Sequence, residues 1–126
     1  MINWKRCIYM ETAEAIDSVT WKHWKNVDGG IDYDNFKVEL IDIWHFLMSY
    51  LLTTNSVEEV AELTMKFVNE KAEIKLPKSL DAEANLALDE ILLPYEEMMF
   101  LSIMKDNSEE YIEAFIKSFF VCLDSA

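Results

Sequence analysis

The stretch "CIYMETAEAIDSVTWKHWK" (residues 7–25) has the periodicity of an amphipathic α-helix, but two of its acidic residues break the pattern. At about 100° per residue, its apolar side chains gather on one face together with Trp4. Glu11 falls in the middle of this apolar face, and Glu14 falls beside Cys7 at its edge. The opposite side is expected to be solvated, because it carries Lys5, Arg6, Thr12 and Asp17. Burying a charge is costly, so the two misplaced carboxylates require a physical reason.

The segment "VELIDIWHFLMSYLL" (residues 38–52) repeats the anomaly. It is apolar on nearly every side, which is typical of a central helix. Its polar exceptions are Glu39, Asp42, His45 and Ser49. Glu39 falls among apolar residues, and Asp42 lies one turn further on the same face. A short loop containing "DGG" (residues 28–30) joins the two helical segments, so we expect them to pack antiparallel with their acid pairs in one cleft.

Four carboxylates in one cleft repel one another unless a cation lies between them. A hard divalent cation that prefers oxygen ligands, Mg²⁺ or alternatively Mn²⁺, meets this need. A simpler interpretation makes Glu11 and Glu14 rim residues that pair with Lys5, Lys22 or Arg6. A di-iron site is a further alternative, since Asp42-x-x-His45 is similar to Glu-x-x-His. That architecture uses two such histidine motifs, and the acid face of the first helix has none.

Helix start and stop signals predict an all-α bundle of about five helices, and no segment alternates as a strand would. We treat residues 1–126 as one helical domain, in which 3–52 form the metal-binding helix pair and 55–126 an acidic helical remainder. Pro94 should kink or divide the fourth helix. The first two predicted helices cover roughly residues 3–26 and 34–54, the second with Asp32 or Asp34 as its N-cap. The third begins at the capping box Ser56-x-x-Glu59 and ends near Pro77. The fourth covers about residues 80–105, and the fifth begins at Asn107 or Ser108.

Composition excludes several classes of protein. The chain has 126 residues, 52% of them hydrophobic, which is ample for one core. Eleven basic against 24 acidic residues give a net charge of −13, so a nucleic-acid partner is not expected. Cys7 and Cys122 are too few for a disulfide framework and indicate reduced thiols in the cytoplasm. The longest apolar segment, 38–52, is short for a membrane span and contains charges, and no leader is expected.

The segments "WKRCIYMETAEAIDSVTWKHWK" (4–25) and "VELIDIWHF" (38–46) closely resemble the dimeric all-α dUTPases. These enzymes belong to the all-α NTP pyrophosphohydrolase superfamily, together with MazG-type enzymes. The resemblance rests on the order E-x-x-E, W-K-x-W-K, E-x-x-D-x-x-H-F and covers residues 3 to about 52. It implies Mg²⁺-dependent hydrolysis of dUTP, and of dUDP, to dUMP by a cytoplasmic homodimer.

Carried over by position, the resemblance implies that Glu11, Glu14, Glu39 and Asp42 bind the metal. Glu14 would also orient the attacking water and accept its proton. The resemblance further implies that His45 and Phe46 lie at the deoxyribose and uracil, with His23 as an additional substrate contact. Without the resemblance, Phe46 would be interpreted as core and His45 as a satisfied core histidine.

The chain also departs from the family pattern. Members begin with an earlier helix that helps to read the uracil, and they end in a motif of the type K-N-x-L-N-x-F-R that binds the phosphates. Neither segment is recognisable here, so we expect the chain to be shortened at both ends. Two alternatives therefore stay open. One is a non-catalytic or truncated helical protein that retains the metal-binding bundle, and the other is a MazG-like pyrophosphohydrolase of another nucleotide.

Overall fold

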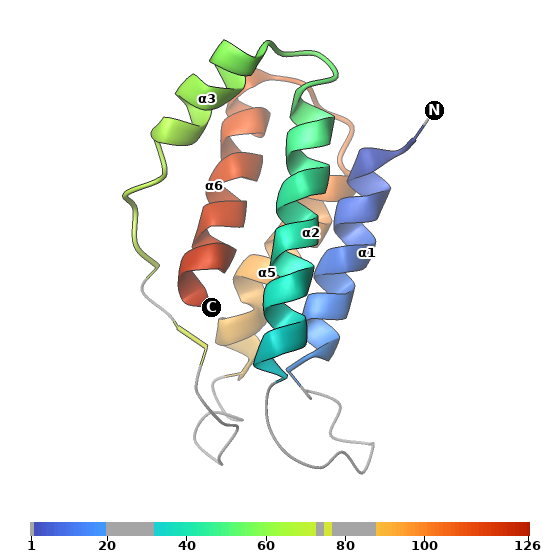
Figure 1. Cartoon of the computed structure of the whole chain (residues 1–126), viewed down its shortest axis with the longest axis vertical. Helices are drawn as coiled ribbons and strands as arrows, with labels where there is room; N and C mark the ends of the chain where they lie inside the picture. Colours follow the sequence, from blue (N-terminus) through green and yellow to red (C-terminus); the bar gives the residue numbers. More distant parts are fainter. Residues whose placement is uncertain (1, 20–31, 73–74, 77–87) are drawn as a thin grey trace.

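The computed structural model describes residues 2–19, 32–72, 75–76 and 88–126. This part of the chain contains five α-helices and no strand, which confirms the predicted all-α fold (Figure 1). The helices are α1 (Trp4–Asp17), α2 (Tyr33–Leu51), α3 (Val57–Met65), α5 (Leu88–Ile103) and α6 (Glu109–Ser125). None of the described helices is long and apolar enough to cross a membrane.

Polar side chains begin the helices as the sequence predicts. Asp32, Ser56 and Ser108 are the N-caps of α2, α3 and α6. Each side chain accepts a hydrogen bond from the backbone N–H three residues further on, which would otherwise lack a partner in the first turn. The predicted capping box of Ser56 and Glu59 is present in full. These caps fix where the helices begin, and thereby the turn of α2 that carries the acidic residues.

Two predicted helix ends are wrong. The first helix, α1, ends at Asp17, where i−3 bonds from the N–H groups of Ser18 and Val19 to the carbonyls of Ala15 and Ile16 tighten the chain; residues 20–26 of the predicted helix lie outside the described residues. The third helix ends at Met65 and not near Pro77. Tighter turns follow it, in which Phe67 N–H donates to the Thr64 carbonyl at 3.0 Å. The fourth predicted helix is described only from residue 88, and Pro94 lies inside α5 without dividing it.

The chain after α3 is held against the last turn of α6. Asp124 accepts a hydrogen bond from the Ala72 N–H, and Leu76 N–H donates to the Ser125 carbonyl at 2.6 Å. Lys71 and Lys75 lie 3.6 and 3.5 Å from the Asp124 carboxylate. The Ala72 N–H and the two lysines hold the pKa of Asp124 below its usual range. These contacts replace the helical continuation that the sequence predicts for this segment.

The core lies between α1, α2, α5 and α6. α1 packs against α2 on one side and against α5 on the other, and α6 packs on α2, α3 and α5. Phe36 and Tyr95 are fully buried and meet edge to face, with ring centroids 5.6 Å apart. The Tyr95 hydroxyl donates to the Cys122 carbonyl at 3.1 Å. Antiparallel packing of α1 and α2, which the short connection predicts, is visible in Figure 1.

The expected solvated side of α1 is only partly solvated. Arg6 and Asp17 are exposed, but Thr12 is fully buried and donates its hydroxyl to the Ile8 carbonyl at 2.7 Å. Lys5 is half-buried and donates to the Met104 carbonyl just beyond α5. The prediction for Thr12 is wrong because α5 packs against this side of α1. The backbone carbonyls satisfy both polar groups within the packed structure.

Candidate functional site

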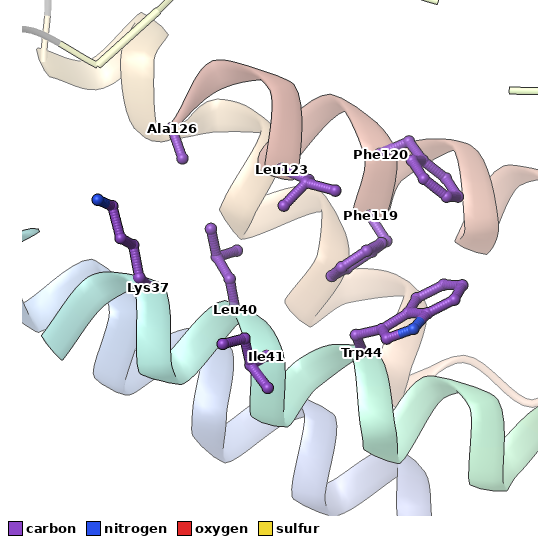
Figure 2. Close-up of a pocket in the computed structure, with 8 residues that line it drawn as sticks. All are labelled: Lys37, Leu40, Ile41, Trp44, Phe119, Phe120, Leu123 and Ala126. Carbon is purple, nitrogen blue, oxygen red and sulfur yellow. The ribbon is translucent and has the colours of Figure 1, made fainter. Parts of the chain in front are cut away.

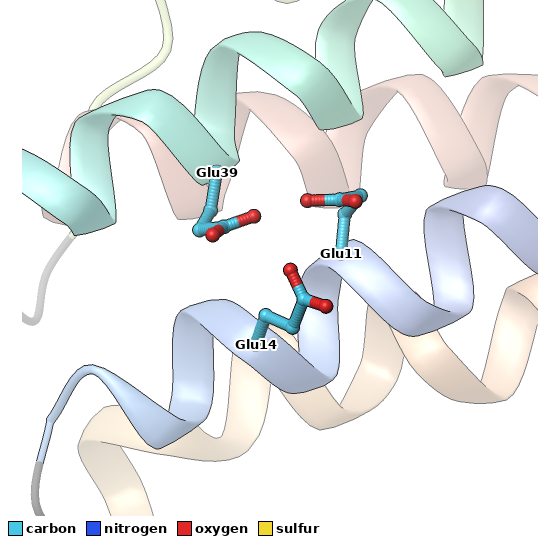
Figure 3. A group of neighbouring side chains, drawn as sticks. All are labelled: Glu11, Glu14 and Glu39. Carbon is cyan, nitrogen blue, oxygen red and sulfur yellow. The ribbon is translucent and has the colours of Figure 1, made fainter.

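The structure brings three of the four predicted metal ligands together. Glu11 and Glu14 on α1 and Glu39 on α2 point toward one another (Figure 3). One carboxylate oxygen from each residue lies within 4.8 Å of the corresponding oxygens of the other two. The i, i+3 spacing puts the two α1 residues on one face, and the packing of α2 on α1 brings Glu39 to the same place.

The three carboxylates differ in burial. Glu39 is only 7% exposed, Glu11 is half-buried and Glu14 is exposed. Within the described residues, Glu39 Oε2 is buried and has no hydrogen-bond partner. Burial, followed by the proximity of Glu11 and Glu14, raises the pKa of Glu39 to about 8. A buried carboxylate oxygen in this position needs either a proton or a cation, and the donor set of three carboxylates suits a hard divalent cation.

A cavity of about 410 Å³ lies beside the carboxylates. Six residues from α1, α2 and the ends of these two helices line it: Glu14, Asp17, Ser18, Asp32, Asn35 and Glu39. The cavity gives a polar ligand access to both Glu14 and Glu39. A cation held by the carboxylates could therefore also bind groups of a second molecule, such as phosphate oxygens.

Asp42 is not in this group of three. It lies on α2 three residues after Glu39 and is half-buried, but it is not one of the residues whose oxygens meet within 4.8 Å. Residues three apart share a helix face, so Asp42 borders the site. Its role as a fourth ligand stays a prediction.

The predicted substrate residues lie in different surroundings. Phe46 is half-buried and packs against Trp4, with ring centroids 6.0 Å apart. His45 is exposed, so its interpretation as a core histidine is wrong. It lies six positions after Glu39, and at about 100° per residue this places it on another side of α2. His23 lies outside the described residues.

Sequence reasoning missed two polar residues beside the carboxylates. Asn35 Nδ2 donates a hydrogen bond to Ser18 Oγ at 2.7 Å, which joins the end of α1 to the start of α2. Ser18 comes four residues after Glu14, and Asn35 comes four residues before Glu39. This i, i+4 spacing from both acids was the available signal, because such residues share a helix face.

Comparison with known families matches residues 2–125 to the family described as dUTPase. The chain belongs to the dUTPase family. It is therefore a dUTP diphosphatase-like hydrolase with a nucleotide substrate, and the match supports dUTP hydrolysis among the functions that the sequence left open. The match also extends the similarity beyond residues 3–52 into the acidic remainder. No curated protein matches the chain.

A second cavity, of about 630 Å³, is apolar and lies between α2 and α6 (Figure 2). Trp44 stacks on Phe119 in this cavity, with ring centroids 5.0 Å apart. Ile41 is 56% exposed there, and Lys37 lies at one end. Leu40 and Trp44 of α2 point toward α6, whereas Glu39 points toward α1 (Figures 2 and 3). The apolar cavity and the carboxylates therefore occupy different faces of α2.

Proposed function

We propose that this dUTPase hydrolyses dUTP, and also dUDP, to dUMP with Mg²⁺ held by Glu11, Glu14 and Glu39. Mn²⁺ is the expected substitute. One observation carries the proposal: among the described residues, Glu39 has a buried oxygen without a hydrogen-bond partner, and its carboxylate offers an oxygen within 4.8 Å of oxygens of Glu11 and Glu14. Asp42 is proposed as a fourth ligand because it borders the same face of α2.

The donor set supports Mg²⁺ in particular. Mg²⁺ takes oxygen ligands, and it is usually bound by one or two carboxylates together with waters and substrate phosphates, so three carboxylates offer enough donors. The family match supplies a substrate that carries such phosphates. A cation among the carboxylates would also relieve the repulsion and desolvation that raise the pKa of Glu39.

The carboxylates have distinct proposed roles. When bound, Mg²⁺ would neutralise phosphate charge and lower the pKa of a water molecule bound to it. Glu39 is buried and fixed by its helix, so it anchors the site. Glu14 is exposed and lines the cavity, and we assign to it the general base that orients the attacking water and accepts its proton. The water oxygen bonds to phosphorus as the bridging phosphorus–oxygen bond breaks.

Phe46 is the proposed contact for the deoxyribose and uracil. It lies seven residues after Glu39, two turns along the same face of α2, and Trp4 supports its ring. The proposed substrate contacts of His45 and His23 rest on the family resemblance alone. His45 would need a nucleotide that extends around α2, because its side chain is on another side of the helix.

We also propose a homodimer in which the α2–α6 cavity packs against a second copy. The sequence of α2 is apolar on nearly every side, which is typical of a helix that is covered all round. Yet Val38 is 53% and Ile41 56% exposed on this helix. A second copy would cover these side chains and the aromatic residues of the cavity.

Pyrophosphate release from a panel of deoxynucleoside triphosphates, with and without Mg²⁺, tests the proposed reaction. We expect release from dUTP that depends on Mg²⁺ and is lost in Glu39→Gln. Glu90→Gln, an exposed acid on α5, is the matched control and should keep full activity. Release from dUTP without any divalent cation, or full activity of Glu39→Gln, would overturn the proposed metal site.

A further inference from the structure

Two hydrogen bonds tie the end of α1 to the start of α2. Asn35 Nδ2 donates to Ser18 Oγ at 2.7 Å, and the Asp32 N–H donates to the Ser18 carbonyl at 3.0 Å. The Asp32 carboxylate in turn accepts from the Asn35 N–H at 3.1 Å, which fixes the backbone that carries the amide. We call Ser18, Asp32 and Asn35 the interhelical brace.

The brace lies one helical turn from the carboxylates on both helices. Ser18 is four residues after Glu14 and also donates its hydroxyl to the Glu14 carbonyl at 3.2 Å. Asn35 is four residues before Glu39 on α2. All four residues line the same cavity of about 410 Å³. A change in the brace therefore acts directly on the separation of Glu14 and Glu39.

Once Glu39 is ionised, its charge and the charges of Glu11 and Glu14 push α1 and α2 apart, because these carboxylates lie close together in partly buried positions. Hydrogen bonds one turn away oppose this movement. Mg²⁺ demands near-ideal geometry at about 2.0–2.1 Å, whereas Ca²⁺ accepts flexible geometry at about 2.3–2.6 Å. A fixed, short separation between the helices thus favours the smaller ion.

We propose that Ser18 and Asn35 are positioning residues that set the distance between Glu14 and Glu39 and so select Mg²⁺ over Ca²⁺. The inference rests on the proposed metal site. It goes further in assigning the choice of ion to two residues that are not among the proposed metal ligands. Asp32 contributes through its backbone N–H and its cap on α2.

The test compares Mg²⁺ and Ca²⁺ affinities of Ser18→Ala, Asn35→Ala and the double variant by isothermal titration calorimetry. We expect Mg²⁺ affinity to fall about tenfold or more, as for other residues that orient metal ligands. Ca²⁺ affinity should fall less, so that the affinity ratio moves toward Ca²⁺. The double variant should resemble the stronger single variant, since both substitutions remove the same hydrogen bond between Asn35 and Ser18. Ser18→Thr keeps the hydroxyl and should restore the wild-type ratio.

Matched controls remove a similar hydrogen bond that does not join two helices. Ser49→Ala loses a bond to the His45 carbonyl at 2.9 Å, and Asn55→Ala loses one to the Leu51 carbonyl at 2.9 Å. Both should keep the wild-type ratio of affinities. Circular dichroism checks that each variant folds. Ser18 is buried, so Ser18→Ala is the variant at risk of not folding. Asn35→Ala then carries the test alone, because Asn35 is exposed and alanine favours helix.

The outcomes separate the two proposals. A wild-type protein that binds no Mg²⁺ would overturn the proposed metal site. A wild-type protein that binds Mg²⁺, with an unchanged ratio in folded Asn35→Ala, would overturn the brace alone. Equal losses of Mg²⁺ and Ca²⁺ affinity would also overturn the assigned ion selection.

Discussion

The ring of Trp4 lies against the ring of Phe46, with centroids 6.0 Å apart, two turns from the carboxylates on both helices. Trp4 precedes Glu11 by seven residues and Phe46 follows Glu39 by seven, so the antiparallel helices bring the acids together at one level and the rings at another. The contact between α1 and α2 thus combines a polar site with an aromatic surface. This arrangement suits a molecule with a charged phosphate end and a flat base.

Phe46→Leu tests whether this aromatic surface binds substrate. Leucine keeps an apolar side chain, so we expect stability to change by less than about 1.5 kcal/mol. The loss of ring contact should lower kcat/KM for dUTP about tenfold or more, chiefly through KM. Phe100→Leu, at a 59% exposed position on α5, is the control for both thermal melts and kinetics. Unchanged kcat/KM in Phe46→Leu would make Phe46 a packing residue only.

Glu39→Gln should abolish the stabilisation that Mg²⁺ gives to the folded protein. Binding to the folded state raises the melting temperature, and the amide removes the anchoring charge of the site. The effect is measured by thermal melts monitored by circular dichroism, without Mg²⁺ and at Mg²⁺ concentrations that increase in 10-fold steps. Glu90→Gln should melt like wild type at every concentration. A Mg²⁺-dependent rise that persists in Glu39→Gln would contradict the assignment of this residue.

The pKa of Glu39 predicts a pH dependence of stability in metal-free protein. Its folded pKa is about 8, above the ordinary value of 4.5, so the folded state holds a proton that the unfolded state releases between these values. The contribution of Glu39 to the free energy of unfolding is therefore fully present below about pH 4.5. It is lost as pH rises through 8, and the free energy of unfolding should fall by roughly 2–4 kcal/mol over this range. Urea unfolding in chelator from pH 5 to 9 should show this fall, and Glu39→Gln should flatten it.

The same proton competes with the metal. Mg²⁺ affinity should rise as pH increases toward 8, since the cation binds the ionised carboxylate. Calorimetric titrations at pH 6 and pH 8.5 in buffers of different ionisation enthalpy would reveal proton release on binding. Affinity that is independent of pH over this range would show that Glu39 is already ionised before the cation binds.

Ile41→Glu should convert the proposed homodimer into a monomer. The substitution puts a charge into the apolar α2–α6 cavity, at a side chain that is 56% exposed in the single chain. Light scattering after size-exclusion chromatography measures the mass. Leu93→Glu, at a 62% exposed position on α5, is the matched control and should stay dimeric. Loss of the dimer in Leu93→Glu instead would move the interface to α5.

Local patterns predicted much of this architecture. The caps of α2, α3 and α6 follow from side chains that accept hydrogen bonds within the first turn, which is a local property. Glu11, Glu14 and Glu39 could be recognised because they interrupt apolar faces. Their proximity then needed only the antiparallel packing of α1 and α2.

The features that the local sequence patterns did not predict depend on tertiary contacts. Thr12 is buried because α5 covers that side of α1, and no local signal tells which face a distant helix will cover. The i, i+3 spacing predicts that Asp42 shares a face with Glu39. It does not predict whether the Asp42 carboxylate joins those of Glu11, Glu14 and Glu39, and in the structure it is not one of that group. Ser18 and Asn35 look like ordinary polar residues at helix ends, and only the contact between them reveals the brace.

The attachment of Ala72 and Leu76 to α6 has a consequence for local unfolding. Ala72 and Leu76 donate their amide protons to Asp124 and Ser125, about 50 residues away in the chain. These amides can exchange with solvent only when the segment leaves the last turn of α6. Their hydrogen-exchange rates should therefore rise together when Asp124 is replaced by Asn, so that two distant pieces of the chain open as one cooperative unit.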